Sequence, residues 1–130
     1  MVYRLILNES QLGLKLASLK GSTSPVYLYF TTTIVDGKRW CPDCRSAEPI
    51  LEEAFGSLPA SATILEIQVP RESWKVQPGP NHPFRKPPFN VRGLPTLSLW
   101  NATTEKVEKS FTEGECEQLE NLLEVFSSHY

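Results

Sequence analysis

The sequence predicts an α/β protein with a central mixed, mostly parallel sheet that carries helices on both faces. Two observations predict this class. Helical and extended patterns alternate along most of the chain, and one of the extended runs, Val26–Phe30, is continuously apolar. Continuous apolar runs are typical of central strands in parallel sheets, because both faces of such strands are covered. The 130 residues match the length of one domain, so we expect a single domain spanning residues 1–130.

The first half of the chain predicts four segments in order. Tyr3–Leu7 has the pattern of a short strand. Ser10–Lys20 has the pattern of a helix with Leu12, Leu16 and Leu19 on one face. Ser10 is a plausible N-cap for this helix. Val26–Phe30 is the continuous apolar run, which predicts a buried strand, and the polar segment Thr31–Arg39 that follows predicts a loop.

A second helix and a second buried strand follow this loop. Apolar residues recur at helical spacing after Cys44, and Gly56 ends the helix. Ala62–Val69 predicts the second buried strand, because Ile64, Leu65, Ile67 and Val69 are apolar. The apolar residues of the predicted helix are Ala47, Ile50, Leu51, Ala54 and Phe55.

The second half of the chain begins with a long irregular stretch, Pro70–Arg92, which contains six of the 11 prolines. A loop of this length in a compact domain is usually functional or disordered. Thr96–Trp100 and Lys106–Phe111 predict a hairpin of two strands. Glu115–His129 predicts a final helix, because its apolar residues recur at intervals of three and four.

Composition argues against several classes of protein. The net charge of −2 gives no basic field for nucleic acid or an anionic membrane, and no apolar run approaches the length of about 18 residues that a membrane-spanning helix needs. Three cysteines are too few for the disulfide framework of a secreted protein. The first nine residues lack the pattern of a signal peptide. We therefore expect a cytoplasmic protein that contacts neither nucleic acid nor membrane.

The motif Cys41-Pro42-Asp43-Cys44 lies where a loop gives way to a helix. Cys41 therefore falls at the predicted N-terminus of the helix, where free N–H groups and the helix dipole favour a thiolate. Pro42 suits the first helical turn, which needs no N–H donor. Asp43 should oppose the thiolate slightly, while the helix terminus and Arg45 favour it.

The spacing of the two cysteines predicts thiol–disulfide exchange. Cys44 lies one helical turn from Cys41, close enough to form a disulfide with it. In this exchange Cys41 attacks a substrate disulfide, Cys44 then releases the reduced substrate, and an external reductase restores the dithiol. The alternative is half of a zinc site, but the remaining candidate ligands form no second closely spaced pair. These candidates are His82, Cys116 and His129.

Four features, one of which is made of two segments, resemble the thioredoxin-related proteins of 14 kDa, also known as the thioredoxin domain-containing protein 17 or Clot family. The two most specific are the Trp-Cys-Pro-Asp-Cys signature and the proline loop. Two others resemble the family's strand into the active site and its long loop, and Pro49 matches the position where the second helix of the thioredoxin fold kinks. In order, the matching segments are Tyr29-Phe30-Thr31, Trp40-Cys41-Pro42-Asp43-Cys44, Trp74, Asn81-His82-Pro83-Phe84-Arg85 and Gly93-Leu94-Pro95-Thr96-Leu97.

The resemblance implies a thioredoxin-like fold and a cytosolic disulfide reductase. It implies that Cys41 is the nucleophile and Cys44 the resolving thiol, with other residues supporting the active site. Pro95 would follow a cis peptide bond and hold the Leu94 backbone beside Cys41, although a proline that opens an edge strand is the simpler interpretation. Trp40 would pack over the active-site disulfide unless it is an ordinary surface aromatic. The supporting residues are Trp40, Pro42, Asp43, Leu94 and Pro95.

The resemblance also implies partners and substrates. Thioredoxin reductase, drawing on NADPH, would supply the electrons, and the substrates would include cystine, selected proteins, and nitrosylated or persulfidated thiols. A peroxidase activity and contact with a dynein light chain are associated with the family. We expect a monomer without a bound cofactor or metal. The alternative function is a non-catalytic, redox-sensitive interaction module that holds a signalling partner through Pro70–Arg92.

The sequence departs from ordinary thioredoxin at three places. Tyr29 stands where thioredoxin has a buried aspartate, so this proton acceptor is missing. Thr31–Arg39 and Pro70–Arg92 are enlarged, and both should crowd the active site and restrict large substrates. Pro87-Pro88 argues against a regular helix in the long loop.

The remaining residues of interest have structural interpretations. Cys116 lies on the apolar side of the last predicted helix, which favours a core residue over a regulatory thiol. His82 and His129 are expected to be solvated. Trp74 and Phe84 are expected to anchor the long loop to the body of the protein.

Overall fold

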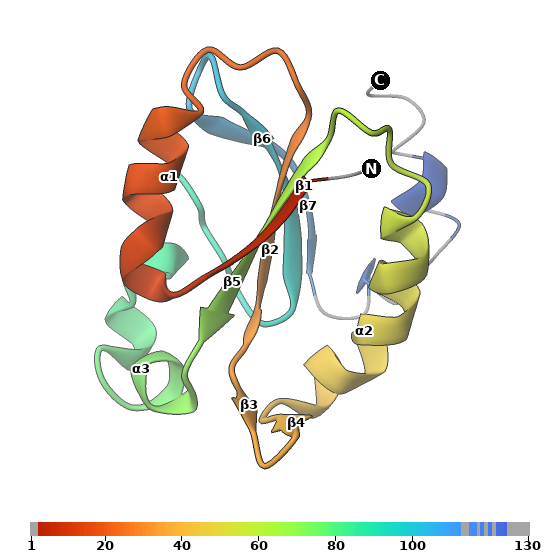
Figure 1. Cartoon of the computed structure of the whole chain (residues 1–130). Helices are drawn as coiled ribbons and strands as arrows, with labels where there is room; N and C mark the ends of the chain where they lie inside the picture. Colours follow the sequence, from red (N-terminus) through yellow and green to blue (C-terminus); the bar gives the residue numbers. More distant parts are fainter. Residues whose placement is uncertain (1–2, 113–114, 117, 119, 121, 125–130) are drawn as a thin grey trace.

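A computed structural model of the chain describes residues 3–112, 115–116, 118, 120 and 122–124. Its central feature is a five-stranded mixed sheet in the order β1-β5-β2-β6-β7, with helices on both faces (Figure 1). The α/β class predicted from the sequence is therefore confirmed. The strands of this sheet are β1 (Tyr3–Leu7), β2 (Val26–Thr32), β5 (Thr63–Val69), β6 (Thr96–Asn101) and β7 (Lys106–Thr112).

Strand direction brings the ends of three strands to one edge of the sheet. β5 pairs in parallel with β1 and β2, and β6 runs antiparallel to both β2 and β7. The carboxyl ends of β2 and β5 therefore meet the start of β6. All of β2 is buried, as is β5 except for Gln68. Cover on both faces thus explains why apolar residues dominate both strands.

The helices divide between the two faces of the sheet. In Figure 1, α1 (Leu12–Ser18) and α3 (Arg71–Lys75) lie on one side, and α2 (Pro42–Phe55) lies on the other. Each face encloses its own core. The core beneath α1 and α3 includes Leu12, Leu16, Leu28, Phe30, Leu65, Ile67, Trp74 and Phe84. The core beneath α2 includes Tyr27, Tyr29, Ala47, Leu51, Phe55, Ile64, Leu97 and Leu122.

The predicted start of the first helix was wrong. Ser10 is not its N-cap, because the chain enters a 3-10 turn, η1 (Glu9–Gln11), that is capped by Asn8. The Asn8 side chain accepts hydrogen bonds from the backbone N–H groups of Ser10 and Gln11, at 3.0 and 3.1 Å. The Gln11 side-chain oxygen in turn accepts a hydrogen bond from the Asn8 N–H at 2.9 Å, which completes a capping box.

The predicted loop Thr31–Arg39 is partly regular. β2 extends to Thr32, and the short strands β3 (Ile34–Val35) and β4 (Lys38–Arg39) pair as a hairpin outside the main sheet. Asp36 and Gly37 form its turn with φ values of 53° and 76°. An Asp-Gly pair suits a two-residue hairpin whose central residues both require positive φ. This dipeptide was therefore the signal in the sequence for the hairpin.

The long stretch Pro70–Arg92 is also more ordered than predicted. It contains α3 and two 3-10 turns, η2 (Gly79–Asn81) and η3 (Pro83–Arg85), and it has no regular helix at its paired prolines. Trp74 and Phe84 are both buried, which confirms that they anchor the stretch to the main core.

The prediction that His82 is solvated was wrong. Its side chain is 2% exposed and forms a close contact through Nε2 with a carboxylate oxygen of Glu9. His82 Nδ1 accepts a hydrogen bond from the Phe84 N–H at 3.1 Å, and the ring packs against Trp74. Both ring nitrogens of His82 therefore have a polar partner, the Glu9 carboxylate and the Phe84 N–H, and the ring face has an aromatic neighbour.

Part of the predicted last helix lies outside the described residues, including Leu119, Phe126 and His129. Residues 120 and 122–124 are helical, and Leu122 is buried. Cys116 is fully buried, which confirms its place in the core. In the part of the chain that the structure describes, no helix has the length and apolar character needed to span a membrane.

Candidate active site

The two cysteines of the motif lie at the start of α2. Cys41 is the N-cap residue, with extended backbone angles of φ −101° and ψ 125°, and Pro42 is the first helical residue. The Cys41 carbonyl accepts a hydrogen bond from the Arg45 N–H at 3.2 Å, which begins the hydrogen-bond ladder of α2. Cys41 is half-buried and Asp43 is exposed, whereas Cys44 is fully buried. The structure therefore places Cys41 at the helix N-terminus, where the sequence predicted it.

The segment before Cys41 is tied to the sheet. The indole N–H of Trp40 donates to the Val69 carbonyl at the end of β5, at 2.8 Å. Arg39 donates through Nη1 to the Thr32 carbonyl at the end of β2, at 2.7 Å. Half-buried Trp40 therefore packs against the core and fixes the active-site segment to β5.

The proline loop lies directly beside the first cysteine. The Cys41 thiol donates a weak hydrogen bond to the Leu94 carbonyl, with an Sγ–O distance of 3.8 Å. The Leu94–Pro95 peptide bond is cis, as we expected. The Thr96 hydroxyl donates to the Gly93 carbonyl at 2.6 Å and so braces the loop. Seven residues expected at the active site therefore come together from two segments: Trp40, Pro42, Asp43 and both cysteines at α2, and Leu94 and Pro95 before β6.

The second cysteine is buried beneath the first, and both carry free thiols. Burial and, after it, the charge of Cys41 raise the pKa of the Cys44 thiol to about 12. Interactions with the nearby hydroxyls of Thr31 and Thr32, which lack good hydrogen-bond geometry, act in the opposite direction and lower this pKa. Cys44 is therefore protonated and shielded in the reduced protein at neutral pH.

The strand position of the missing aspartate is occupied by Tyr29. Tyr29 is fully buried, and burial raises the pKa of its hydroxyl well above the usual value. A phenol with a raised pKa cannot accept a proton from a thiol at neutral pH, so Tyr29 does not replace the carboxylate as a base.

A buried carboxylate on the neighbouring strand was not found from the sequence. Glu66 pairs in register with Tyr29 and is 2% exposed. It accepts hydrogen bonds from Arg4 at 2.5 Å, from Gln68 at 3.0 Å and from Arg39 at 3.4 Å. Burial opposes ionisation of Glu66, but the bonds from Arg4 and Gln68 and the charges of Arg39 and Arg4 outweigh it and lower the pKa. The signal for this cluster was a single charge inside the apolar run Ile64-Leu65-Glu66-Ile67.

The described residues offer no support for a zinc site. Within them, no group of three or more His, Cys, Asp and Glu side chains is placed to hold a metal ion. His82 is bound to Glu9, and the Cys116 thiol donates to the Phe111 carbonyl at 3.2 Å and lies 3.8 Å from the Pro95 carbonyl.

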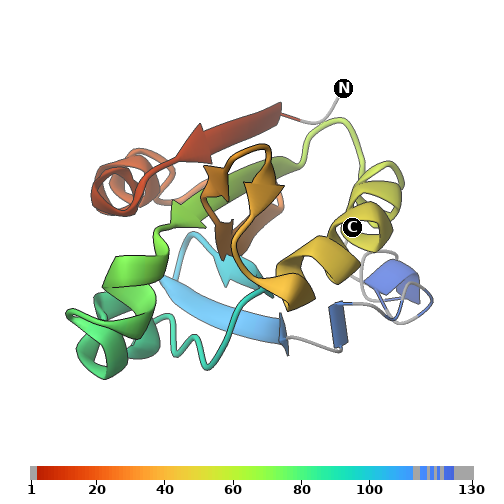
Figure 2. The same cartoon turned by 90° about the horizontal axis from the view of Figure 1, so that it is seen from below.

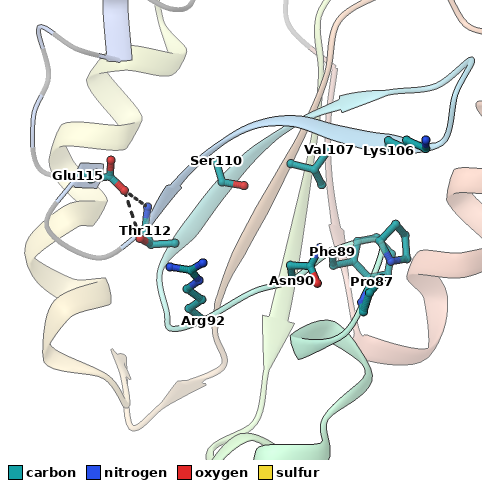
Figure 3. A pocket seen from close by; sticks show the side chains of 10 residues that line it. Pro87, Phe89, Asn90, Arg92, Lys106, Val107, Ser110, Thr112 and Glu115 are labelled. Carbon is teal, nitrogen blue, oxygen red and sulfur yellow. Dashed lines mark hydrogen bonds between the residues drawn. The ribbon is translucent and has the colours of Figure 1, made fainter.

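A pocket of about 590 Å³ lies away from the dithiol, between the end of the long loop and β7 (Figure 3). Lys106 lies at one end of it, on the side of Pro87, and Glu115 lies at the other end. Arg92 lies toward the Glu115 end, near Thr112. Neither cysteine of the motif lines it. The pocket residues are Pro87, Pro88, Phe89, Asn90, Arg92, Lys106, Val107, Ser110, Thr112 and Glu115.

The sequence of the chain is similar to a known family along nearly its whole length. Residues 7–128 match the family model described as thioredoxin domain-containing protein 17-like, thioredoxin domain. Thioredoxin domain-containing protein 17 of Homo sapiens is 36% identical over 105 residues, which cover 79% of this chain and 77% of that protein. Thioredoxin-like protein Clot of Arabidopsis thaliana is 31% identical over 107 residues, which cover 76% and 78%.

The fold is similar to solved thioredoxin structures. Oxidized thioredoxin O1 from Arabidopsis thaliana superposes with a TM-score of 0.58 at 19% identity, covering 95% of this chain and 96% of that one. Oxidized thioredoxin O2 from the same organism gives a TM-score of 0.59 at 19% identity, covering 95% and 92%. These similarities confirm the thioredoxin-like fold.

Proposed function

Because this chain belongs to the thioredoxin domain-containing protein 17-like family, and so has a thioredoxin-type redox function, we propose that it is a cytoplasmic disulfide reductase. The reaction would proceed through Cys41 and Cys44. The observation that carries this proposal is the difference between the two thiols, one half-exposed at the N-terminus of α2 and the other buried one turn later. A reachable nucleophile beside a shielded resolving thiol is what thiol–disulfide exchange requires.

The reaction has two exchange steps. The Cys41 thiolate attacks one sulfur of the substrate disulfide, so that a mixed disulfide forms and one substrate thiolate leaves. Cys44 then attacks Cys41, the mixed disulfide breaks, and the second substrate thiol leaves with the proton of Cys44. The substrate disulfide is thereby reduced and the protein dithiol oxidised. Thioredoxin reductase, using NADPH, would return two electrons to the protein.

The site favours small substrates in this proposal. The β3–β4 hairpin stands between the N-terminus of α2 and the α3 segment at the active-site end of the sheet (Figure 2). The Leu94 backbone beside Cys41 offers an extended substrate a place to pair as an added strand. Cystine, accessible disulfides of selected proteins, and nitrosylated or persulfidated thiols fit such a site better than a large folded protein.

Turnover of cystine and of insulin with thioredoxin reductase and NADPH tests the proposal. We expect cystine to be reduced efficiently and insulin poorly. Cys41→Ser should abolish cystine turnover, and Cys44→Ser should accumulate a mixed disulfide that is visible by mass spectrometry. Cys116→Ser serves as the control, because this thiol lies in the core outside the motif. Normal cystine turnover by Cys41→Ser would refute the proposal.

A second candidate function is a non-catalytic interaction module that holds a signalling partner, such as a dynein light chain. The observation that favours it is the pocket beside the long loop, which Arg92 and Lys106 both line. Deleting the loop would remove Trp74 and Phe84 from the core, so point substitutions make a cleaner test. Partner binding that is lost in Arg92→Ala/Lys106→Ala but kept in Cys41→Ser would favour this function. Partner binding that is kept in Arg92→Ala/Lys106→Ala but lost in Cys41→Ser would favour the reductase.

A further inference from the structure

Two hydroxyl groups at the end of β2 are buried without conventional hydrogen bonds. Thr31 and Thr32 are both completely buried. Within the described ranges, neither hydroxyl has a hydrogen-bond partner of good geometry. Two buried hydroxyls on β6 do have partners, since Thr96 donates to the Gly93 carbonyl and Ser98 pairs with Ser110. The buried hydroxyl of Tyr29, beside Thr31, has no partner of good geometry among the described residues either. A buried hydroxyl without a partner destabilises a fold, so two in succession require an explanation.

Both hydroxyls lie beside the sulfur of the resolving cysteine. The Cys44 thiol interacts with Thr31 and with Thr32, and each interaction favours its charged form. Cys44 comes from α2 and the two threonines from β2, so the contact joins the helix to the strand that leads into the active site. Two hydroxyl groups in an apolar core therefore converge on the sulfur atom that must become anionic in the second exchange step.

Among the residues that the structure describes, the other groups that act on this sulfur or on its threonine neighbours are not suited to assist its ionisation. Cys41 acts on Cys44 as a like charge and opposes the second thiolate. Tyr29 lies beside Thr31, but its own pKa is raised. The carboxylates of Glu48 and Glu66 act on Tyr29 and are both bound to Arg39.

We propose that the hydroxyls of Thr31 and Thr32 form a hydrogen-bonding site for the Cys44 thiolate in the resolving step, which makes both threonines catalytic residues. This inference rests on the proposed dithiol reductase. A threonine hydroxyl can rotate, so it can donate to the sulfur as negative charge develops, without movement of the backbone. Hydrogen bonds to a charged acceptor are stronger than neutral ones, so the benefit appears only when the thiolate forms.

The resolving step balances without an additional reactant. The bond between Cys44 Sγ and Cys41 Sγ forms, and the bond between Cys41 and the substrate sulfur breaks. Cys44 is oxidised and the substrate sulfur is reduced. The proton of Cys44 passes to the departing thiolate, or to solvent when that thiolate is weakly basic. The hydroxyls of Thr31 and Thr32 keep their own protons throughout.

The reaction of the reduced protein with dithiobis-nitrobenzoate measures the two steps separately. This aromatic disulfide releases one coloured thiolate when Cys41 attacks it and a second when Cys44 resolves the mixed disulfide. Cys44→Ser should show the first phase alone, which assigns the second phase. Thr31→Val and Thr32→Val remove the hydroxyls while keeping β-branched side chains of similar shape. Thr63→Val is the matched control. Thr63 is a buried threonine at the start of β5, beside Val26, and therefore lies at the other end of the sheet from Thr31 and Thr32.

We expect the valine variants to slow only the second phase. Losing one charge-assisted hydrogen bond should lower the thiolate population about tenfold, and the greater nucleophilicity of a more basic thiolate should recover part of this. The net loss is about threefold to fivefold for each hydroxyl, and the pH at which a given rate is reached should rise by about half a pH unit. Thr31→Ser and Thr32→Ser should restore the rate, and Thr63→Val should leave both phases unchanged.

Stability separates this role from a structural one. Because the hydroxyls lack good partners in the resting protein, the valine variants should unfold in urea at the same or higher denaturant concentration. An unchanged second phase in Thr31→Val/Thr32→Val would overturn the inference but leave the reductase intact. Absence of the first phase in the wild-type protein would instead refute the proposed reductase, and the inference with it.

Discussion

At the scale of single residues, the molecule distinguishes two thiols of the same chemistry by their depth. Cys41 is the N-cap of α2 and half-buried, and Cys44 is fully buried one turn later. Burial is the largest contribution to the raised pKa of Cys44. The order of the two exchange steps therefore follows from exposure, because a substrate disulfide can reach Cys41 alone.

This difference predicts selective alkylation of the native reduced protein. A short treatment with iodoacetamide at neutral pH should modify Cys41 and leave Cys44 and Cys116 unmodified, because both are completely buried. Peptide mass spectrometry after digestion measures the sites. The same treatment in denaturant is the control and should modify all three cysteines. Equal modification of Cys41 and Cys44 in the native protein would contradict the structure.

The raised pKa of Cys44 also predicts how stability depends on pH. The folded protein holds the Cys44 proton up to a pKa of about 12, whereas an unfolded thiol loses its proton near the ordinary value of 9.0. Folding therefore gains stability from this group below the ordinary pKa, and loses it as pH rises toward the folded pKa. The loss is up to about 1.4 kcal/mol for each pH unit in this window.

Urea unfolding of the reduced protein would measure this dependence between about pH 8 and about pH 10.5, roughly one pH unit below and one and a half pH units above the ordinary thiol pKa of 9.0. Cys44→Ser is the variant to compare, because a serine hydroxyl does not titrate there. Its stability should fall less steeply over the same range. Identical slopes for the two proteins would show that the pKa of Cys44 is not raised.

At the scale of elements, one ion cluster around the buried carboxylate of Glu66 joins four parts of the fold. Glu66 of β5 binds Arg4 of β1 and Arg39 of β4, while Arg39 also contacts Glu48 of α2. Arg39 immediately precedes Trp40 and donates to the end of β2. The cluster therefore holds the active-site segment against the sheet edge.

Removing the central carboxylate should be costly. Glu66→Ala leaves two arginines without their buried partner, and we expect it to lower the free energy of unfolding by about 3 kcal/mol. Glu52→Ala is the matched control, because Glu52 binds Arg4 at the surface with its side chain 42% exposed, and it should cost less than about 1 kcal/mol. Denaturant unfolding at neutral pH measures both variants.

The sign of the pH effect gives a second check on this cluster. The pKa of Glu66 is lowered in the folded protein, so its contribution is present above the ordinary carboxyl pKa. The contribution is lost as pH falls toward the folded pKa. The stability difference between the wild type and Glu66→Gln should therefore shrink on acidification. A difference that grew at low pH would contradict the cluster.

At the scale of the whole molecule, the long loop is part of the core rather than an appendage. Phe84 packs against Phe30 of β2 with ring centroids 5.1 Å apart and against Phe89 at 5.7 Å. The guanidinium of Arg85 lies over the Trp74 ring at 3.6 Å and donates to the Trp74 carbonyl at 2.9 Å. We therefore expect the loop, the sheet and the active-site edge to unfold together.

Truncation of one loop anchor tests this expectation. Phe84→Ala should lower the free energy of unfolding by about 3–5 kcal/mol, because it leaves a cavity between the loop and β2. Val76→Ala is the control on the same loop, since Val76 is 63% exposed and its truncation should be nearly neutral. Urea denaturation curves compare the two. A cost below about 1 kcal/mol for Phe84→Ala would mean that the loop does not belong to the core.

Much of the sheet and the position of the dithiol could be predicted from local pattern. The apolar runs at β2 and β5 and the helical spacing after Cys44 identified the core elements within one or two residues. The errors at Ser10 and Thr31–Arg39 arose where capping and turn chemistry outweigh periodicity. His82 was misassigned because its carboxylate partner is 73 residues away in the sequence.

The sequence by itself determined the α/β class, the thioredoxin family and the place of Cys41 at a helix start, because these depend on periodicity and on motifs of a few adjacent residues. Only the tertiary structure decided which polar groups surround Cys44, and that Glu66 binds two arginines. It also decided that the long loop belongs to the core. Those features depend on which strands become neighbours, and burial then sets the cost of every unpaired hydroxyl and charge.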